Sequence, residues 1–304
     1  MTSFAFLGEW FSDNESLIQT ILIYALLAFS IQVALRSGVF SLAGIGFYAI
    51  GSYVAAVLVG DHGVPTVPAI AVGVALCGVL GWLLAWLLVR LRDLYLAMAT
   101  VAFDLMVGVV ALNWDGVTGG ALGLFGVPIT VTTLGMFVTV VVVIVLLFLM
   151  ERGTIGRTLE TVREDEELAK SLAVDTRRYR RFAFVVSSML GALAGAFHAL
   201  LFSTVSAGDA GFNLIVLALT MVIIGGFGSW LGALIGAILI AWLPLRLEGF
   251  SDWWYALYGG MMIVVATYIP GGIYGVGRQL LRRSSRLRTA VRRVRPARPG
   301  RQPA

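Results

Sequence analysis

A chain of 304 residues in which 59% are hydrophobic and only 13% are charged lacks the polar surface needed to cover a soluble globule, so the composition indicates an integral membrane protein. The net charge of +5 does not indicate a nucleic-acid-binding protein, because most of the 22 basic residues lie in one loop, 151–181, and in the tail after Arg278. The single cysteine, Cys77, excludes an intramolecular disulfide.

The N-terminal segment, residues 1–16, carries three acidic residues and no Lys or Arg. A signal peptide requires a positively charged start, so none is predicted here. We expect this segment to lie on the extracytoplasmic side of the membrane and the first apolar run to remain as a span.

Apolar runs long enough to cross a bilayer as a helix, about 17 to 25 residues, follow one another along the chain. The first of them are 17–35, 38–60, 66–89, 94–113, 130–150 and 182–202. The stretch 212–245 is too long for one crossing and is broken by Gly225, Gly226 and Gly228, so it predicts two spans. Their junction is either part of an inner gate or a simple tight turn. With a last run, 253–270, the sequence predicts an all-α polytopic membrane protein of about nine transmembrane helices.

The distribution of basic residues predicts the orientation of these spans, because Lys and Arg resist translocation. With nine crossings and an outside N-terminus, 21 of the 22 basic residues fall on the cytoplasmic side. A single span over 212–245 would instead put the ten arginines of the tail outside. The tail, 276–304, also contains three prolines, and we expect it to be disordered in the cytoplasm.

Small residues four positions apart let helices approach closely when no hydrophobic force acts between helices in lipid. Gly191 and Gly195 form one such face, and Gly228, Gly232 and Gly236 form another. These faces predict close helix packing and carry no information on activity.

The loop 151–181 contains eight basic and seven acidic side chains between two nearly uncharged runs. An apolar stripe runs through it at helical spacing, on one face of a single predicted helix. Its members are Ile155, Leu159, Val162, Ala169 and Ala173. The loop is either a solvated helix lying on the membrane, or a coupling helix that buries its stripe in a groove of an ATPase while its charges set the register.

No Gly-x-x-x-x-Gly-Lys-Ser/Thr phosphate loop occurs in the sequence, and its only lysine, Lys170, follows Glu-Leu-Ala rather than glycine. The chain therefore does not hydrolyse nucleotide by that means, and we expect it to have no catalytic residues and no cofactor. An ATP-driven function requires a separate ATPase, for which the loop is the predicted receptor. His198 lies on a span with no second His or Cys nearby, so we predict no metal site. It is either a hydrogen-bonded packing residue, which we favour, or a proton carrier.

Asp104 lies in the middle of the span 94–113, where an ionisable group costs about 2.5 to 3.5 kcal/mol unless it faces water or a partner. We expect it to face the interior of the bundle. It then either lines the translocation path and attracts the ammonium group of an amino acid, or bonds a neighbouring helix or caps an unwound turn. Thr100 and Thr220 are assigned to the same candidate path, although such residues often bond across helices.

Several short motifs, taken in their order along the chain, resemble those of a known family. They are Arg92 to Phe103, Thr118-Gly119-Gly120 followed by Gly123-Leu124, Gly156-Arg157, Arg163-Glu164-Asp165-Glu166, Phe182-Ala183-Phe184, Gly191 to Ala196 and Ile224 to Ser229. Together they resemble the permease subunits of bacterial branched-chain amino acid ABC importers, in particular the second of the two paired permeases. The resemblance covers roughly residues 20–275.

This resemblance implies a permease fold like that of type II importers, with a transmembrane domain over 17–275 in the bacterial inner membrane. It implies a second permease subunit, two cytoplasmic ATPases that bind the ATP, and an extracytoplasmic binding protein as partners, beside membrane lipid. It also implies that branched-chain amino acids are moved inward. The positions assigned to ATPase coupling are Gly156, Arg157, Leu159, Val162, Arg163, Glu164, Asp165, Glu166, Ala169 and Ala173.

Two other functions stay open on the residues alone. Permeases for urea or short amides share this scaffold and form the alternative cargo class. A secondary transporter driven by ions requires more carboxylates within the spans, or an inverted repeat, and Asp104 is the only acid clearly inside a span. A membrane enzyme is disfavoured, because catalysis requires at least two converging groups and nothing in the sequence brings Asp104 and His198 together.

Overall fold

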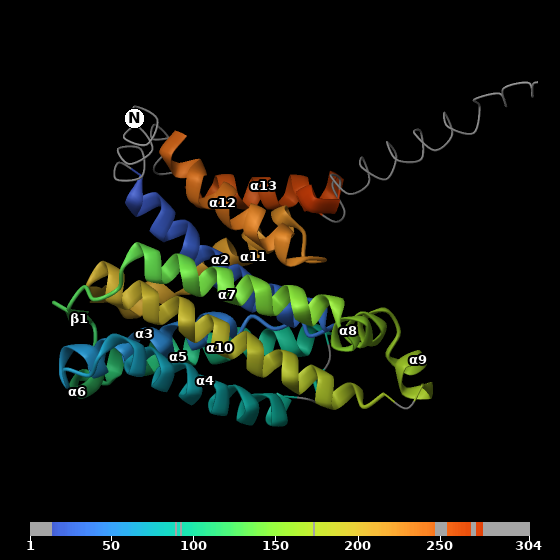
Figure 1. Ribbon diagram of the computed structural model, residues 1–304, viewed down its shortest axis with the longest axis horizontal. Coiled ribbons are helices and arrows are strands. Elements are labelled where there is room, and N and C mark those ends of the chain that lie inside the picture. Colours follow the sequence, from blue (N-terminus) through green and yellow to red (C-terminus); the bar gives the residue numbers. More distant parts are fainter. Residues whose placement is uncertain are drawn as a thin grey trace, which may run out of the picture.

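The computed structural model describes residues 14–88, 90–91, 93–172, 174–246, 254–268 and 272–275. Its helices run mostly along one axis, with β1 and α6 at one end of the bundle and α8 and α9 at the other (Figure 1). The helices are α2 Glu15–Arg36, α3 Gly44–Gly60, α4 Thr66–Leu88, α5 Asp93–Asn113, α6 Asp115–Thr118, α7 Thr133–Arg152, α8 Thr154–Glu164, α9 Glu166–Ser171, α10 Thr176–Phe202, the 3₁₀ helix η1 Ala207–Ala210, α11 Phe212–Gly225, α12 Trp230–Arg246 and α13 Trp254–Tyr268. The short strand β1, Leu124–Phe125, pairs antiparallel with β2, Thr204–Val205.

The prediction of an all-α polytopic membrane protein is confirmed. Among the described residues, five helices are long and apolar enough to cross a membrane, namely α2, α4, α5, α7 and α10. Three shorter apolar helices, α3, α11 and α12, lie within the remaining predicted runs, and α13 overlaps the last one. The total of nine crossings stays a prediction, and residues 1–13 and the tail 276–304 lie outside the described residues.

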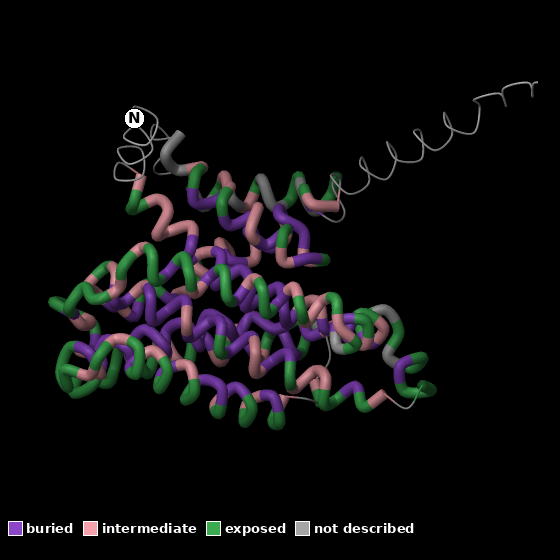
Figure 2. Tube along the Cα trace, in the orientation of Figure 1, coloured by how far each residue is buried: buried purple, intermediate pink, exposed green. Residues whose placement is uncertain are grey.

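The core of the bundle is built around α2 and α10. In α2 and α10, 67% of the residues in the most apolar stretch are buried, whereas in α4 and α7 only 22% are. α2 and α10 are therefore central in the bundle, and α4 and α7 are peripheral (Figure 2). α10 packs along α2, α3 and α4. The hydroxyl of Ser30 on α2 donates to the carbonyl of Ser187 on α10 at 2.8 Å, a polar bond of the kind that joins helices where lipid offers no hydrophobic force.

The two predicted glycine faces have different outcomes. Gly191 and Gly195 of α10 lie directly against the backbone of α3, so that face is confirmed. Gly232 and Gly236 of α12 likewise lie against the backbone of α11. Gly228 does not belong to this face, because it precedes α12 and nothing lies within 4 Å of the position that a Cβ would occupy there.

Candidate translocation and coupling sites

The connection between α2 and α3, residues 37–43, is largely buried but not helical. At the end of α2 the hydroxyl of Ser37 donates to the carbonyl of Ala34 at 2.7 Å. Gly38 follows with a φ of 73°, a left-handed conformation that glycine adopts without steric cost. Non-helical backbone at membrane depth is tolerated where protein covers it. The predicted span 38–60 is therefore a buried non-helical segment followed by a short helix, α3.

Thr100 and Asp104, one turn apart on α5, hold the start of α3. Oγ1 of Thr100 accepts the N–H of Leu42 at 3.1 Å, and Oδ1 of Asp104 accepts the N–H of Gly46 at 2.8 Å. The first N–H groups of a helix have no partner within it, and Ala43, at the N-cap position, makes no side-chain cap. α5 thus supplies the acceptors that the sequence of α3 lacks.

The second carboxylate oxygen of Asp104, Oδ2, is buried and has no hydrogen-bond partner among the described residues. A carboxylate with one hydrogen bond in an apolar interior is under-satisfied, so it is able to accept a proton or a cationic group. Gly46 leaves room for it, because a Cβ there would lie 2.7 Å from both Oδ1 and the ring of Phe103. The bond to a neighbouring helix, one of the two expected roles of Asp104, is observed, and its place in a path stays a prediction.

Thr220 and His198, two further polar residues of the spans, make other contacts than Thr100 and Asp104 do. Thr220, on α11, donates to the carbonyl of Val216 in its own helix at 2.7 Å. α11 packs on α2, α12 and α13, whereas Thr100 and Asp104 face α3. His198 lies between the rings of Tyr48 and Phe202, with centroids 5.5 and 4.8 Å away. Within the described part of the chain no group of three His, Cys, Asp or Glu residues could hold a metal ion.

The central loop forms two helices, α8 and α9, where the stripe predicted one. Asp165 ends α8 and caps α9: its Oδ1 accepts the N–H groups of Glu167 and Leu168 at 2.9 and 3.0 Å. An aspartate whose carboxylate binds backbone N–H groups favours a helix start over a helix interior. The prediction of one continuous helix through residues 155–173 is therefore wrong. At the α7–α8 corner, Gly156 fits against the carbonyls of Met150 and Glu151, where a side chain would collide.

The apolar stripe of this loop is covered by the chain itself. Leu159, Val162 and Ala169 are at most 2% exposed without any partner protein. Ala173 and the side chain of Ile155 lie outside the described residues, as do the side chains of Glu164 and Glu166. The expectation that an ATPase buries the stripe is corrected for Leu159, Val162 and Ala169, because the chain itself already covers them. The face left for a partner is the charged one, which includes the exposed residues Arg157, Glu160, Glu167 and Lys170.

Arg163, near the end of α8, contacts two distant segments at once. Its guanidinium lies over the ring of Phe227, 4.5 Å from the centroid, in the turn between α11 and α12. Its Cα lies beside Gly38, where an added Cβ would come within 3.3 Å of it. α8 therefore touches both the non-helical α2–α3 connection and the α11–α12 turn.

Glu151, at the end of α7, joins three helices at the same end of the bundle. It forms an ion pair with Arg36 at the end of α2 and accepts the N–H of Trp230 at the start of α12 at 3.2 Å. The two charged side chains are only 13% and 15% exposed. This pair was not predicted, although Arg36 and Glu151 are opposite charges at the ends of two predicted spans.

The predicted break in 212–245 is a tight turn over Gly226 to Ser229. Gly225 is the last residue of α11, and Gly226 follows with a φ of 103°. Gly272, beyond α13, packs directly against the backbone of Gly225 and Gly226. Its possible role as an inner gate is untested by this geometry and stays a prediction.

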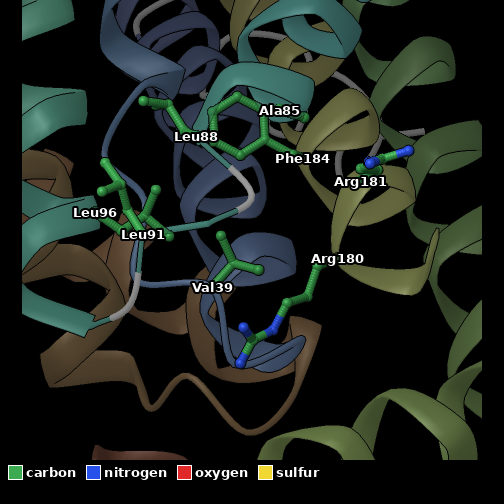
Figure 3. Close-up of a pocket in the computed structure, with 8 residues that line it drawn as sticks. All are labelled: Val39, Ala85, Leu88, Leu91, Leu96, Arg180, Arg181 and Phe184. Carbon is green, nitrogen blue, oxygen red and sulfur yellow. The ribbon is translucent and has the colours of Figure 1, made fainter. Parts of the chain in front are cut away.

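A small cavity lies between the end of α4 and the start of α10, lined by Val39, Phe184, Arg180 and Arg181 among others (Figure 3). Its volume of about 20 Å³ is enough for one water molecule. The two guanidinium groups point in different directions, so they do not clamp a single anion (Figure 3). This cavity is too small for an amino acid.

A bundle of apolar helices with a buried non-helical connection and a charged helical arm at one end is the architecture of a polytopic membrane protein. The chain belongs to the family described as the permease component of branched-chain amino acid transport systems, whose profile matches residues 15–266. This confirms the resemblance found in the sequence, and the family places the chain in the bacterial inner membrane as a multi-pass transport permease.

Individual relatives agree with this assignment. The chain is 28% identical to the high-affinity branched-chain amino acid transport system permease protein LivM of Escherichia coli (strain K12) over 296 residues, which cover 86% of this chain and 70% of the relative. It is 27% identical to LivM of Salmonella typhimurium, over 87% of this chain and 70% of the relative. The fructose import permease protein FrcC of Rhizobium meliloti is 31% identical over 48% of this chain and 42% of its own. No solved structure matches the chain.

Proposed function

We propose that this chain is one of two permease subunits of an ATP-driven importer that moves branched-chain amino acids into the cell. Its partners are a second permease subunit, two cytoplasmic ATPases that bind the ATP, and an extracytoplasmic binding protein. The family match over residues 15–266 and the two LivM relatives support the cargo. They do not favour urea, short amides or an ion-driven carrier.

The position of α8 is the observation that carries the coupling part of this proposal. Its apolar side is buried in the permease and its charged side is exposed, so an ATPase that engages the charged side moves α8 together with the body. Arg163 passes this movement to the Phe227 turn and to Gly38. Thr100 then links the α2–α3 connection to α5 through Leu42, and Asp104 links the start of α3 to α5 through Gly46.

Reconstitution tests the proposed function directly. The full chain is combined in proteoliposomes with the ATPases, second permease and secreted binding protein encoded in neighbouring reading frames. We expect uptake of radiolabelled leucine, isoleucine and valine that requires ATP and persists when ionophores dissipate the ion gradients. Uptake at full rate without the ATPases, or its loss with ionophores while ATP is present, would contradict the proposal.

Replacing Arg163 by alanine is expected to weaken the coupling between the ATPase and the permease. The cation–π contact with Phe227 contributes about 0.5 to 1 kcal/mol at an exposed site, so leucine uptake should fall roughly two- to five-fold. Co-purification of the ATPases with a tagged permease should be unchanged, because the remaining charged face still docks. Phe227→Tyr keeps the ring and serves as the matched control, with near-normal uptake. Equal uptake in Arg163→Ala and the unaltered chain would rule out this link.

Replacing Asp104 by asparagine tests its place in the translocation path. Asparagine keeps an oxygen for the N–H of Gly46 and removes the charge, so the bundle should assemble normally. Loss of one charge-assisted contact to the cargo ammonium group, about 1.5 kcal/mol, should lower uptake at limiting leucine roughly tenfold. Size-exclusion chromatography of the complex is the assembly control. Unchanged uptake at limiting substrate would leave Asp104 with its observed role at the start of α3 alone.

A further inference from the structure

The arm formed by α8 and α9 leaves one apolar pair uncovered. Leu168 of α9 and Leu172 at its C-cap lie one turn apart and are 52% and 63% exposed, whereas Ala169 is buried. Exposed leucines on a span face lipid, but this pair lies in the segment 151–181, whose fifteen charged side chains keep it out of the bilayer core. The two leucines therefore face water unless another surface covers them.

Exposed acidic side chains lie next to this pair. Asp165 and Glu167 are both exposed, and Asp165 is fixed beside Leu168 because its Oδ1 accepts the N–H groups of Glu167 and Leu168 at 2.9 and 3.0 Å. Lys170, the one basic residue of α9, is two positions from each leucine and so lies on another side of the helix. An anionic membrane surface repels acidic side chains, so it does not fit this face. An apolar segment with a basic rim fits it.

The C-terminal tail of the same chain has this pattern in its sequence. The tail, 276–304, lies outside the described residues and contains ten arginines and no Asp or Glu. Four apolar residues recur in it at helical spacing, which places them on one face of a helix with most of the arginines on the rest of its surface. They are Leu280, Leu287, Val291 and Val294. A basic segment of this kind is able to fold as a helix when it binds a partner.

The described chain ends beside the arm, so the tail starts there. Gly272 packs on the α11–α12 turn, where a Cβ added to it would lie 2.4 Å from the backbone nitrogen of Gly226. The next residue of that turn, Phe227, lies 4.5 Å from the guanidinium of Arg163 on α8. The end of α13 also lies at the same end of the molecule as α8 and α9 (Figure 1). Fifteen further residues span about 50 Å when extended, more than the combined length of α8 and α9, about 26 Å, so the tail is long enough to reach α9.

We propose that the tail, through residues 278–295, docks on the face of α9 that carries Leu168 and Leu172. Its apolar side covers the leucines, and its arginines lie beside Asp165 and Glu167. Because the tail is tethered beside the arm, its local concentration there is in the millimolar range, and a weak contact keeps it in place. Anionic lipid also attracts arginines, but it would leave the two leucines in water.

This contact gives the tail a regulatory role. The ATPases engage the same arm, so the tail and the ATPases compete for it, and the docked tail slows ATPase binding. The competition rests on the proposed function, whereas the contact between tail and arm does not.

Disulfide crosslinking in the full chain, without any ATPase, tests the contact. The native Cys77 is buried, so copper phenanthroline oxidises cysteines that are introduced at the surface. One cysteine replaces Leu172 and the other replaces Leu287 or, in a second variant, Val291, so that either register of the tail is detected. We expect a disulfide within one chain, identified by mass spectrometry, both in detergent and in vesicles that contain phosphatidylglycerol. Leu168→Cys in place of Leu172→Cys repeats the test in case the first pair does not fold.

Lys170→Cys with the same tail cysteines is the matched control, because position 170 is equally open to the oxidant but lies on another side of α9. Its crosslinking should be several-fold slower, and Glu167→Lys should slow the Leu172→Cys reaction as well. The proposal is overturned if the two arm positions react equally fast, or if disulfides form only between two chains. Loss of the disulfide in phosphatidylglycerol vesicles would also overturn it and assign the tail to lipid. Crosslinking that is unchanged when the ATPases are added would overturn the competition alone.

Discussion

Leucine in place of Gly195 is expected to prevent stable folding of the bundle. A Cβ at this position would collide with the carbonyl of Tyr48 on α3, and backbone cannot move aside as the tip of a side chain can. Overpacking of this kind costs about 3 kcal/mol or more of the free energy of unfolding. That is a large share of the roughly 5 to 15 kcal/mol that stabilises a typical domain. The yield of monodisperse protein in detergent and its thermal unfolding measure the effect.

Gly108 provides the control for this substitution. It also lies within a span, on α5, but nothing lies within 4 Å of the position of its Cβ. Leucine at 108 should therefore be tolerated, and its better helix propensity should even stabilise α5 by a few tenths of a kcal/mol up to about 1 kcal/mol. Similar stability of Gly195→Leu and Gly108→Leu would show that α10 and α3 do not approach as closely as the structure has them.

The spans were predictable because an apolar run of about twenty residues has few other uses in a protein chain. The start of α3, in contrast, was not predictable from the sequence. Val39 to Ala43 is an apolar segment that reads as part of a span, and the helix begins only at Gly44. The groups that satisfy the backbone there, Thr100 and Asp104, lie on another helix. Nothing in the local sequence of the α2–α3 connection reveals acceptors that are 58 residues away.

The central loop shows a second limit of periodicity. Leu159, Val162 and Ala169 are buried within the chain, but the stripe that they form in the sequence does not reveal which body covers it. The break at Asp165 had a local signal, because aspartate favours the N-cap position. The stripe alone predicted a single helix, and that prediction was wrong. The contacts of Arg163 with Gly38 and Phe227 join segments with no shared sequence pattern.

Replacing Glu151 by glutamine is expected to destabilise the chain more than removing the whole ion pair. Glutamine retains an oxygen for the N–H of Trp230 but leaves the positive charge of Arg36 largely buried without its partner. Breaking one side of such a pair costs about 3 kcal/mol. The double variant Arg36→Met/Glu151→Gln removes both charges, and replacing a buried pair by apolar or neutral groups is often close to neutral, within about 1 kcal/mol.

Comparing the stability of the single variant with that of the double variant distinguishes two roles of the ion pair. Either the attraction between the two charges stabilises the fold, or each charge only prevents the other from being buried unpaired. In detergent, the unaltered chain and the double variant should unfold at similar temperatures, and Glu151→Gln should unfold at a clearly lower temperature than both. If the double variant unfolds as early as the single one, the attraction between Arg36 and Glu151 itself holds α2 to α7. If neither differs from the unaltered chain, the three-helix junction does not stabilise this end of the bundle. In the expected case, α2, α7 and α12 are joined beside α8 chiefly by packing and by the Trp230 N–H bond, and this end of the bundle tolerates the loss of both charges together.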